Sequence, residues 1–320
     1  MESSNSSVCS VSEFYLICFP ELNSGRYVLS ICFVVLMLSS LVANSLLMTT
    51  VFAVQVLQEP IYYLLSMLAA VDMLLCVVST PKTLALLWFD AIAVDTHTCF
   101  AQMYFIYSCV SMESALFLIL AFDRYISICH PLRYPSIITT GIVIKAAAFM
   151  LGRSLILSLP LPLLAAFRNY CSRNSIAHCY CETWAVVTLS AADSTIVSLY
   201  MLAVTSVVYG TDLLFIIFSY YMIIQAVLRL DSSGAALKAL STCSSHLILI
   251  LFFYSTIFTI LVSNQSSHSV PRHVHVLLSI LYHLVPPALN PIVYAIRTKE
   301  IRQALRKLLG KIKVFPIVQR

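Results

Sequence analysis

The chain has 320 residues, of which 60% are hydrophobic and only 10% charged, and its mean hydropathy is +0.91. A soluble domain of this length does not need so much apolar surface, so the composition excludes a soluble globular protein and indicates a membrane protein with several spans. The net charge of +5 does not indicate nucleic acid as a partner, because the basic residues are concentrated on one side of the predicted spans.

Seven apolar stretches approach or exceed the ~20 residues that a helix needs to cross a bilayer. The third begins at about Phe100 and ends at Asp123-Arg124-Tyr125, and the sixth ends at about Val262. The other five cover about residues 28–54, 61–87, 142–166, 196–228 and 273–296. The sequence therefore predicts an all-α membrane protein, a seven-transmembrane helix bundle that occupies residues 28–297 and fills the chain as one membrane domain.

The distribution of lysine and arginine predicts the orientation of this bundle. Eight of the nineteen lie after Tyr294 and five more lie in loops on the same side, against five in loops on the opposite side. By the positive-inside rule the C-terminus is cytoplasmic, and an odd number of spans then makes the N-terminus extracellular. Residues 1–21 have neither a basic n-region nor a continuous apolar h-region, so they are not a cleaved signal peptide. We expect residues 1–27 to form an exposed extracellular tail in which the sequon at Asn5 is glycosylated.

Several ionisable or amide side chains fall inside the predicted spans. Asn44 is expected to hydrogen-bond a neighbouring helix, and Arg153 needs an acidic or carbonyl partner at its depth. Two carboxyl groups at mid-membrane depth, Asp72 and Glu113, would repel each other in a low dielectric if both were ionised. We therefore expect them to share a proton or to bind a cation such as sodium, the alternative being two neutral, hydrogen-bonded acids. The fifth span also contains Asp212.

The sequence contains no catalytic constellation. It has no glycine-rich phosphate loop, no metal-spaced set of histidines and cysteines, and no nucleophile with its base, so we expect neither an enzyme nor a bound cofactor. A retinal-binding photoreceptor would need a lysine in the seventh span, and residues 273–296 contain none. The remaining classes are a receptor and a small-molecule membrane transporter. The transporter is disfavoured because the chain has no inverted repeats or glycine-broken helices.

Three motifs lie at the predicted cytoplasmic ends of spans. The third span closes with AFDRYISICHPLRY, the segment KALSTCSSH opens the sixth span, and the seventh ends in NPIVY, where the proline weakens the helical ladder and makes a pivot. Together with LQEPIYYLLSMLAAVD at the second span, these motifs resemble the odorant receptors, a branch of the rhodopsin-like G-protein-coupled receptors. The stretches LPLP and PKTLALLWF resemble the class I, fish-like group of that branch.

This resemblance implies a switch at the cytoplasmic end that couples to a heterotrimeric G protein of the stimulatory, olfactory type and raises cyclic AMP. The residues assigned to the switch are Asp123, Arg124, Tyr125, Tyr220, Lys238, His246, Asn290, Pro291 and Tyr294. The resemblance also implies that Asn44 ties the first, second and seventh helices together and that Asp72 is the family's sodium-site residue. A receptor of this kind is expected in the plasma membrane, in olfactory cilia.

Cysteines on the predicted extracellular side lie where disulfides persist; they include Cys99, Cys171, Cys179 and Cys181. By resemblance, Cys99 pairs with a cysteine of the loop 167–193, and the pattern HCYC makes Cys181 the better match. The family's second bridge lies within this loop, but its downstream cysteine is replaced here by Ala191. A local bridge between Cys171 and Cys179 is the expected substitute.

The resemblance also predicts an apolar, aromatic pocket between the outer halves of the helices, suited to a small volatile or amphiphilic molecule. Its expected lining is Tyr107, Val110, Ser111, Val204, Val208, Tyr254, Phe258, Leu261, Gln265 and Ile280. Many class I members bind carboxylic acids through a basic residue near the outer end of the sixth span, where this chain has Gln265. An uncompensated buried anion costs several kcal/mol, so we expect neutral odorants. A non-olfactory chemosensory receptor is the alternative within the same class.

Residues 298–320 are predicted to form an amphipathic eighth helix and a cytoplasmic tail. The apolar side chains Ile301, Leu305, Leu308 and Leu309 share one helical face, and lysines and arginines occupy the others. This pattern is typical of a helix that lies on the anionic cytoplasmic leaflet of a bilayer.

Overall fold

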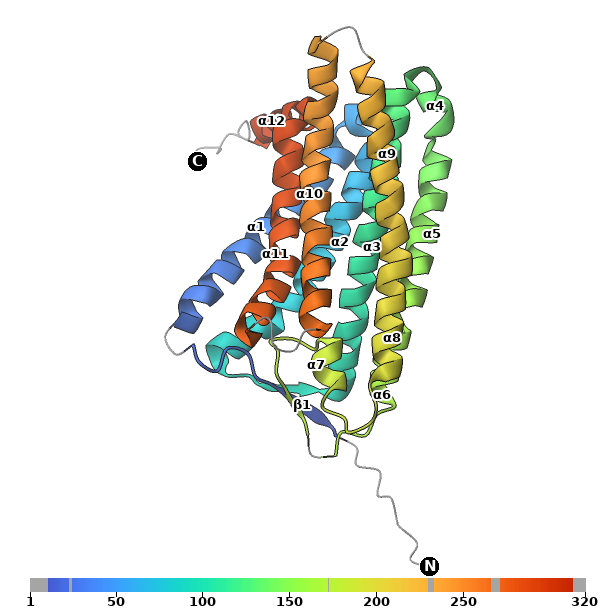
Figure 1. Cartoon of the computed structure of the whole chain (residues 1–320). Coiled ribbons are helices and arrows are strands. Elements are labelled where there is room, and N and C mark those ends of the chain that lie inside the picture. The colour runs from blue at the N-terminus through green and yellow to red at the C-terminus, as the bar shows by residue number, and fades with distance from the viewer. Residues whose placement is uncertain (1–10, 23–24, 172, 230–232, 266–270, 313–320) are drawn as a thin grey trace, which may run out of the picture.

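The computed structural model of the chain describes residues 11–22, 25–171, 173–229, 233–265 and 271–312. Within these ranges it describes the backbone alone for 233–242, 245, 261–265, 297, 309 and 311–312. The helices form one elongated bundle, with strand β1 at one end and helices α4 and α12 at the other (Figure 1). We call these two ends the lid end and the Arg124 end.

Seven helical segments of the described chain run along the bundle, which confirms the predicted all-α membrane fold. They are α1 (Gly25–Ala53), α2 (Pro60–Phe89), α3 (Thr96–Cys129), α5 with α6 (Thr140–Ser158 and Pro160–Ala166), α8 with η3 and α9 (Thr195–Ala203, Val204–Tyr209 and Gly210–Leu228), α10 (Ser233–Gln265) and α11 (Arg272–Arg297). The short elements between and after them are η1 (Gln55–Leu57), η2 (Pro131–Arg133), α4 (Tyr134–Ile137), α7 (Thr183–Val187) and α12 (Lys299–Ile312).

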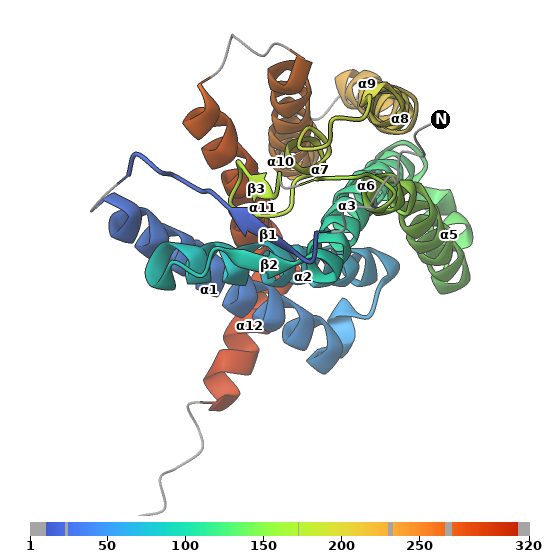
Figure 2. The ribbon, with the colours of Figure 1, turned by 90° about the horizontal axis from the view of Figure 1, so that it is seen from below.

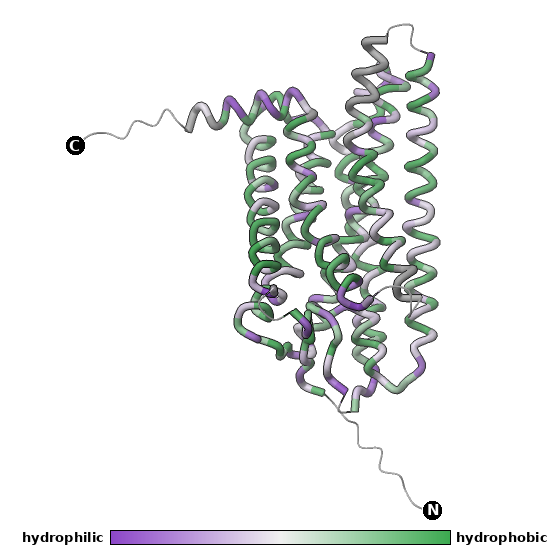
Figure 3. Tube along the Cα trace, turned by 60° about the vertical axis from the view of Figure 1, so that its left-hand side comes forward, coloured by the Kyte–Doolittle hydropathy of each residue, from purple (hydrophilic) through white to green (hydrophobic). Residues whose placement is uncertain are grey.

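Six helical stretches of the described chain are long and apolar enough to cross a membrane, and the apolar part of α10, His246–Ile260, is shorter. Hydrophobic residues cover the bundle along its length, whereas hydrophilic residues gather at the lid end and in α12 (Figure 3). Helix α12 projects sideways from the bundle (Figure 2), and its residues Ile301 and Ala304 are buried. This position suits an amphipathic helix on a membrane surface.

Local sequence signals explain where the helices begin and end. Pro60 occupies the first turn of α2, where its missing N–H costs nothing. Asp95 caps α3 by accepting hydrogen bonds from the backbone N–H groups of His97 and Thr98, at 2.9 and 3.1 Å. At the other end of α2, Asp90 adopts a left-handed conformation with φ of 50°, which stops the helix.

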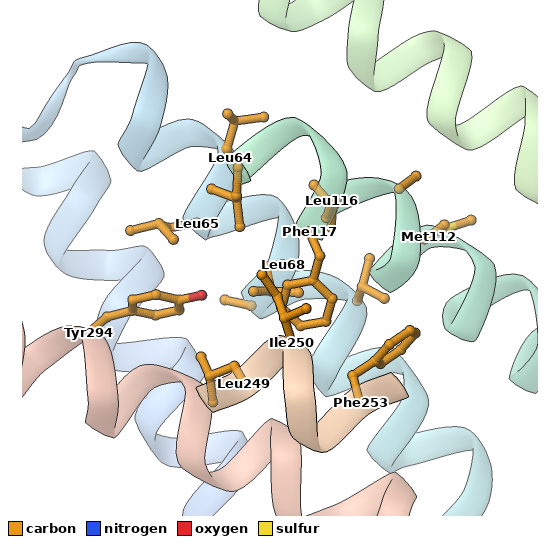
Figure 4. Packing of buried hydrophobic residues seen from close by; sticks show 14 of the residues in the cluster. Leu64, Leu65, Leu68, Met112, Leu116, Phe117, Leu249, Ile250, Phe253 and Tyr294 are labelled. Carbon is orange, nitrogen blue, oxygen red and sulfur yellow. The ribbon is translucent and has the colours of Figure 1, made fainter. Parts of the chain in front are cut away.

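Helix α3 is the centre of the bundle. In its most apolar stretch 72% of the residues are buried, against 22% for α1 and for the α5–α6 span. Its Phe117 packs edge-on against Phe253 of α10, with ring centroids 5.2 Å apart, and Leu68 of α2 lies beside them (Figure 4). Because lipid is as apolar as these side chains, close packing of this kind holds the helices together.

A three-stranded sheet at the lid end was not predicted. Strand β1 (Glu13–Leu16) lies between β2 (Ala93–Asp95), which runs antiparallel to it, and β3 (Ser175–Ile176), which runs parallel. The three strands come from distant parts of the chain and cross the end of the bundle (Figure 2). Strands this short carry no readable periodicity, so their pairing is decided by tertiary contacts.

Candidate functional site

The lid end is closed by a layer that we call the lid, made of residues 11–18, 93–95 and 175–182. Phe14 of β1 has no exposed surface and packs edge-on against Tyr170, with ring centroids 5.0 Å apart. Arg272, at the start of α11, donates hydrogen bonds to the carbonyls of Ala177 at 3.1 Å and Ile17 at 3.3 Å. The seventh helix of the bundle therefore holds two segments of the lid at once.

Two disulfides fasten the lid. Cys99 of α3 is bonded to Cys181, the pair expected from the sequence. The expected bridge between Cys171 and Cys179 is wrong, because Cys179 is bonded to Cys18 in the N-terminal segment. The sequence analysis restricted the second bridge to one loop, although Cys18 also lies on the predicted extracellular side, and strand β1 brings it to the loop.

Peptide mapping under non-reducing conditions should therefore find Cys18 linked to Cys179 and Cys99 linked to Cys181. The variant Cys18→Ser should keep the bridge between Cys99 and Cys181. It should lower the thermal stability of the purified protein, because a bridge that closes a long loop typically contributes ~2–5 kcal/mol. A peptide joining Cys171 to Cys179 in the wild-type chain would contradict this assignment.

A cavity of about 100 Å³ lies beneath the lid, between α3, α10, α11 and the fifth span. Its walls are largely apolar and aromatic, with a few polar groups from the lid and α11. The lining residues are Ile106, Tyr107, Val110, Tyr180, Glu182, Met201, Thr205, Tyr209, Ile257, Ile260, Ser279, Tyr282 and His283. An apolar cavity with a few converging polar groups is typical of a small-molecule site.

Two of the residues expected in the pocket, Tyr107 and Val110, line this cavity. Others lie around it without lining it. Ser111 and Ile280 are buried in the helix interfaces, with 2% and 4% of their surface exposed. Tyr254 lies deeper in the bundle, where its hydroxyl is 3.0 Å from Ser114 Oγ.

Three of the residues assigned to the pocket, on the fifth and sixth spans, do not line this cavity. The fifth span lines the cavity through Met201, Thr205 and Tyr209, whereas Val204 and Val208 pack against the core beside it. A π-helical turn, η3, begins at Val204 and changes which residues face inward, because its turn is wider than that of an α-helix.

The third of these residues, Phe258, lies on the sixth span. Phe258 is 66% exposed and faces away from the bundle, and Ile257 and Ile260 of the same helix line the cavity instead. The side chains of Leu261 and Gln265, and the whole of Asn5, lie outside the described residues.

Glu182 is a lining residue that the sequence analysis missed. Its carboxylate accepts hydrogen bonds from the backbone N–H of Ala185 at 2.7 Å and from the hydroxyl of Tyr107 at 3.3 Å. Only 5% of its surface is exposed. The signal that could have found it is its position directly after Cys181, because a disulfide that pins Cys181 over the bundle also fixes the next side chain.

Polar groups at mid-bundle depth join α1, α2 and α11. Pro291 has no N–H, so the carbonyl of Pro287 loses its helical partner, and the Asn44 side-chain amide donates to it at 2.8 Å. Asn290 donates to Asp72 at 2.8 Å, and both Asp72 and Glu113 are buried. That the two acids share a proton or a cation stays a prediction.

A second polar cluster joins α3, α5, α9 and α10. The Arg153 guanidinium donates to both carboxylate oxygens of Asp212, each at 2.8 Å, and also to the carbonyl of Ser111 at 3.5 Å. Ser114 donates to Asp212 at 2.7 Å and contacts Tyr254 of α10. Arg153 thus has the acidic and carbonyl partners that its depth requires.

At the Arg124 end, the guanidinium of Arg124 donates to the carboxylate of its neighbour Asp123, with Nε at 2.9 Å. The hydroxyl of Tyr134 donates to the other carboxylate oxygen at 2.9 Å. Burial and the nearby Asp123 raise the pKa of Tyr134, so its hydroxyl keeps the proton that it donates. Arg124 is 17% exposed and Asp123 is 1% exposed, so the carboxylate holds the cation in place.

The other residues assigned to the switch are arranged around this pair. His246 of α10 packs edge-on against Tyr294 of α11, with ring centroids 5.5 Å apart, and Tyr220 of α9 is buried nearby in the core. The hydroxyl of Tyr125 lies 3.2 Å from His130 Nε2, so it faces the end of α3. The side chain of Lys238 lies outside the described residues.

Comparison with known proteins gives consistent matches over almost the whole chain. A family model described as olfactory receptor matches residues 31–312. The human olfactory receptor 56A4 is 45% identical over 309 residues, 97% of this chain and 99% of the relative. The mouse olfactory receptor 56B34 is 46% identical over 310 residues, 97% of this chain and 96% of the relative. The human olfactory receptor 52K2 is 40% identical over 316 residues, 99% of each chain.

Proposed function

This chain belongs to the olfactory receptor family, and from that premise we propose that it binds a small, neutral, apolar or amphiphilic odorant in the cavity beneath the lid. Binding activates a heterotrimeric G protein of the stimulatory, olfactory type at the Arg124 end and raises cyclic AMP. The observation that carries this proposal is a cavity bounded by α3, α10 and α11, the three helices that also supply Arg124, His246 and Tyr294.

The small size of the cavity supports a mechanism in which the ligand separates the helices around it. At about 100 Å³ it is smaller than the about 300–1,000 Å³ of a usual ligand site, so a ligand fits only when the helices around it separate. Ile257 and Ile260 line the cavity from α10. One turn before Ile257 on the same helix, Tyr254 contacts Ser114 of α3. A ligand that pushes α10 outward weakens this contact and favours a bundle that is open around Arg124.

We propose an orientation in which the lid end is extracellular and the Arg124 end is cytoplasmic. The two disulfides of the lid support an extracellular lid end, because disulfides persist in oxidising compartments. The excess of lysine and arginine at the Arg124 end supports a cytoplasmic position for that end. We propose the plasma membrane of olfactory cilia as the site of action.

Neutral ligands follow from the charges of the cavity. Among the described residues that line it there is no lysine or arginine, and Glu182 contributes a carboxylate. A ligand carboxylate would be buried without a compensating cation and would face a like charge, which disfavours its ionised form.

Fatty acids should therefore activate the receptor less than their alcohols or methyl esters at neutral pH, by at least about tenfold in potency. The measurement is a cyclic-AMP reporter in cells that express the chain, with surface staining to normalise expression. Acids that are tenfold more potent than their neutral partners would contradict the proposed ligand class. Uptake of odorant without any cyclic-AMP response would favour a transporter instead.

A further inference from the structure

The carboxylate of Glu182 is held rigidly in the cavity. Its neighbour Cys181 is bonded to Cys99 of α3, and the backbone N–H of Cys181 donates to the side chain of Gln102 at 3.0 Å. On the other side, Glu182 Oε2 accepts from the N–H of Ala185 at the start of α7. A side chain fixed from both directions loses little entropy when a ligand binds to it.

This carboxylate retains capacity to accept hydrogen bonds. An ionised carboxylate has about four lone-pair positions, and two are used, one of them by the 3.3 Å contact from Tyr107. That contact is longer than the ~2.7–2.8 Å usual for an O–H donor. None of the three ion pairs found among the described residues includes Glu182.

The nearby imidazole of His178 supplies no cation to this carboxylate. His178, in the lid, is 1% exposed, and burial lowers the pKa of its imidazole well below its usual range, so the ring is neutral. His275 of α11 interacts electrostatically with Glu182, and His283 packs its ring against Tyr180, with centroids 4.9 Å apart. A buried acid with open lone pairs gains most from a donor that arrives with the ligand.

We propose that Glu182 determines ligand specificity by accepting a hydrogen bond from the polar group of the odorant, which is therefore a neutral hydrogen-bond donor: a hydroxyl on a short apolar body. This rests on the function proposed above and narrows it. A ketone or an ether has only acceptors to offer. Either can bind the Tyr107 hydroxyl only by taking it from Glu182, which leaves the carboxylate with one bond fewer.

Four neutral compounds that each contain six carbons and one oxygen test this proposal: the donors 1-hexanol and 2-hexanol, and the acceptors methyl butyl ketone and methyl pentyl ether. Potency is measured by the cyclic-AMP reporter, and binding by thermal-shift stabilisation of the purified full chain. The two donors should exceed the two acceptors by about tenfold or more, the usual effect of a hydrogen bond to a charged group.

The variant Glu182→Gln keeps the size of the side chain and can still accept from Ala185, but it is uncharged and carries its own donors. It should bring the donor-to-acceptor ratio close to one. Glu182→Asp, which keeps the charge, should retain the order of the four compounds. Glu13→Gln, at an exposed acid of the same end, is the matched control and should leave the ratio unchanged.

Equal potency of donors and acceptors in the wild type would overturn the proposal, as would a Glu182→Gln variant that weakens all four compounds by one factor. Silence of all four compounds in both assays would also overturn it. Stabilisation by the donors without any cyclic-AMP response would instead contradict the proposed coupling and leave the role of Glu182 standing.

Discussion

Replacing Asp212 by asparagine should remove most of the receptor from the cell surface. The carboxylate is 4% exposed and binds both terminal nitrogens of Arg153. Without it the guanidinium stays buried beside a neutral amide, and breaking a buried pair in this way costs about 3–5 kcal/mol, a shift of a hundredfold or more in the folded-to-unfolded ratio. Surface staining by flow cytometry of an epitope-tagged chain measures the loss.

The matched control is Asp90→Asn, which breaks the exposed ion pair with Arg26 at the lid end. Asp90 is 66% exposed in that pair, and exposed pairs contribute about 0–1 kcal/mol, so surface expression should remain near wild type. The double variant Arg153→Met with Asp212→Leu removes both charges and should recover much of the lost expression. Wild-type expression of Asp212→Asn would mean that Arg153 finds another partner.

Replacing Arg124 by alanine should abolish the cyclic-AMP response to an agonist while the chain still reaches the surface. Arg124 sits at the edge of the bundle, and its carboxylate partner Asp123 keeps a second bond from Tyr134 when the guanidinium is removed. The expected loss is therefore one of coupling and not of folding. The measurement is agonist-driven cyclic AMP at matched surface expression.

Two further variants sharpen this test. Asp123→Asn frees the Arg124 guanidinium from its partner and should raise the basal signal. Lys145→Ala removes an exposed cation from the same end of the bundle and should signal normally. An Arg124→Ala receptor that signals like the wild type at equal expression would remove this residue from the mechanism.

The helices of this protein could be predicted from sequence because crossing a bilayer requires a long apolar run, and such runs are easy to recognise. The partner of Asn44 was also predictable in kind, since a lone amide in a span bonds a neighbouring helix. Arg153 and Asp212 could each be singled out as buried charges. Their pairing depends on how α5 and α9 turn toward each other, which the sequence does not contain.

The inward faces of the helices were harder to predict. In a soluble helix the exposed face is polar, but in a membrane the outer face is as apolar as the inner one. Phe258 is suited to either face by its chemistry, and it points outward, whereas Ile257 points to the cavity. Resemblance to other receptors assigned Phe258 to the pocket and therefore did not identify the inward face of this helix.

The lid was missed for a different reason. Strand β1 is short and half polar, and β2 and β3 are shorter still, so nothing in their composition separates them from loops. The pairing of Cys18 with Cys179 and the position of Glu182 both depend on this sheet. Contacts between segments this far apart are tertiary, and local sequence rules do not reach them.

The N-terminal segment, with strand β1 and Cys18, is the first part of the lid to leave the ribosome. Cys18 is separated from its partner by 161 residues and Cys99 from its partner by 82, so on the proposed orientation both thiols enter the lumen of the endoplasmic reticulum before either partner has been made. Cys18 and Cys99 can therefore meet each other before either meets the cysteine to which it is bonded in the folded protein. Maturation then requires that these thiols stay reduced until the second loop arrives, or that a mispaired bridge is exchanged. The yield of receptor depends on the redox chemistry of the compartment that makes it as well as on the packing of its helices.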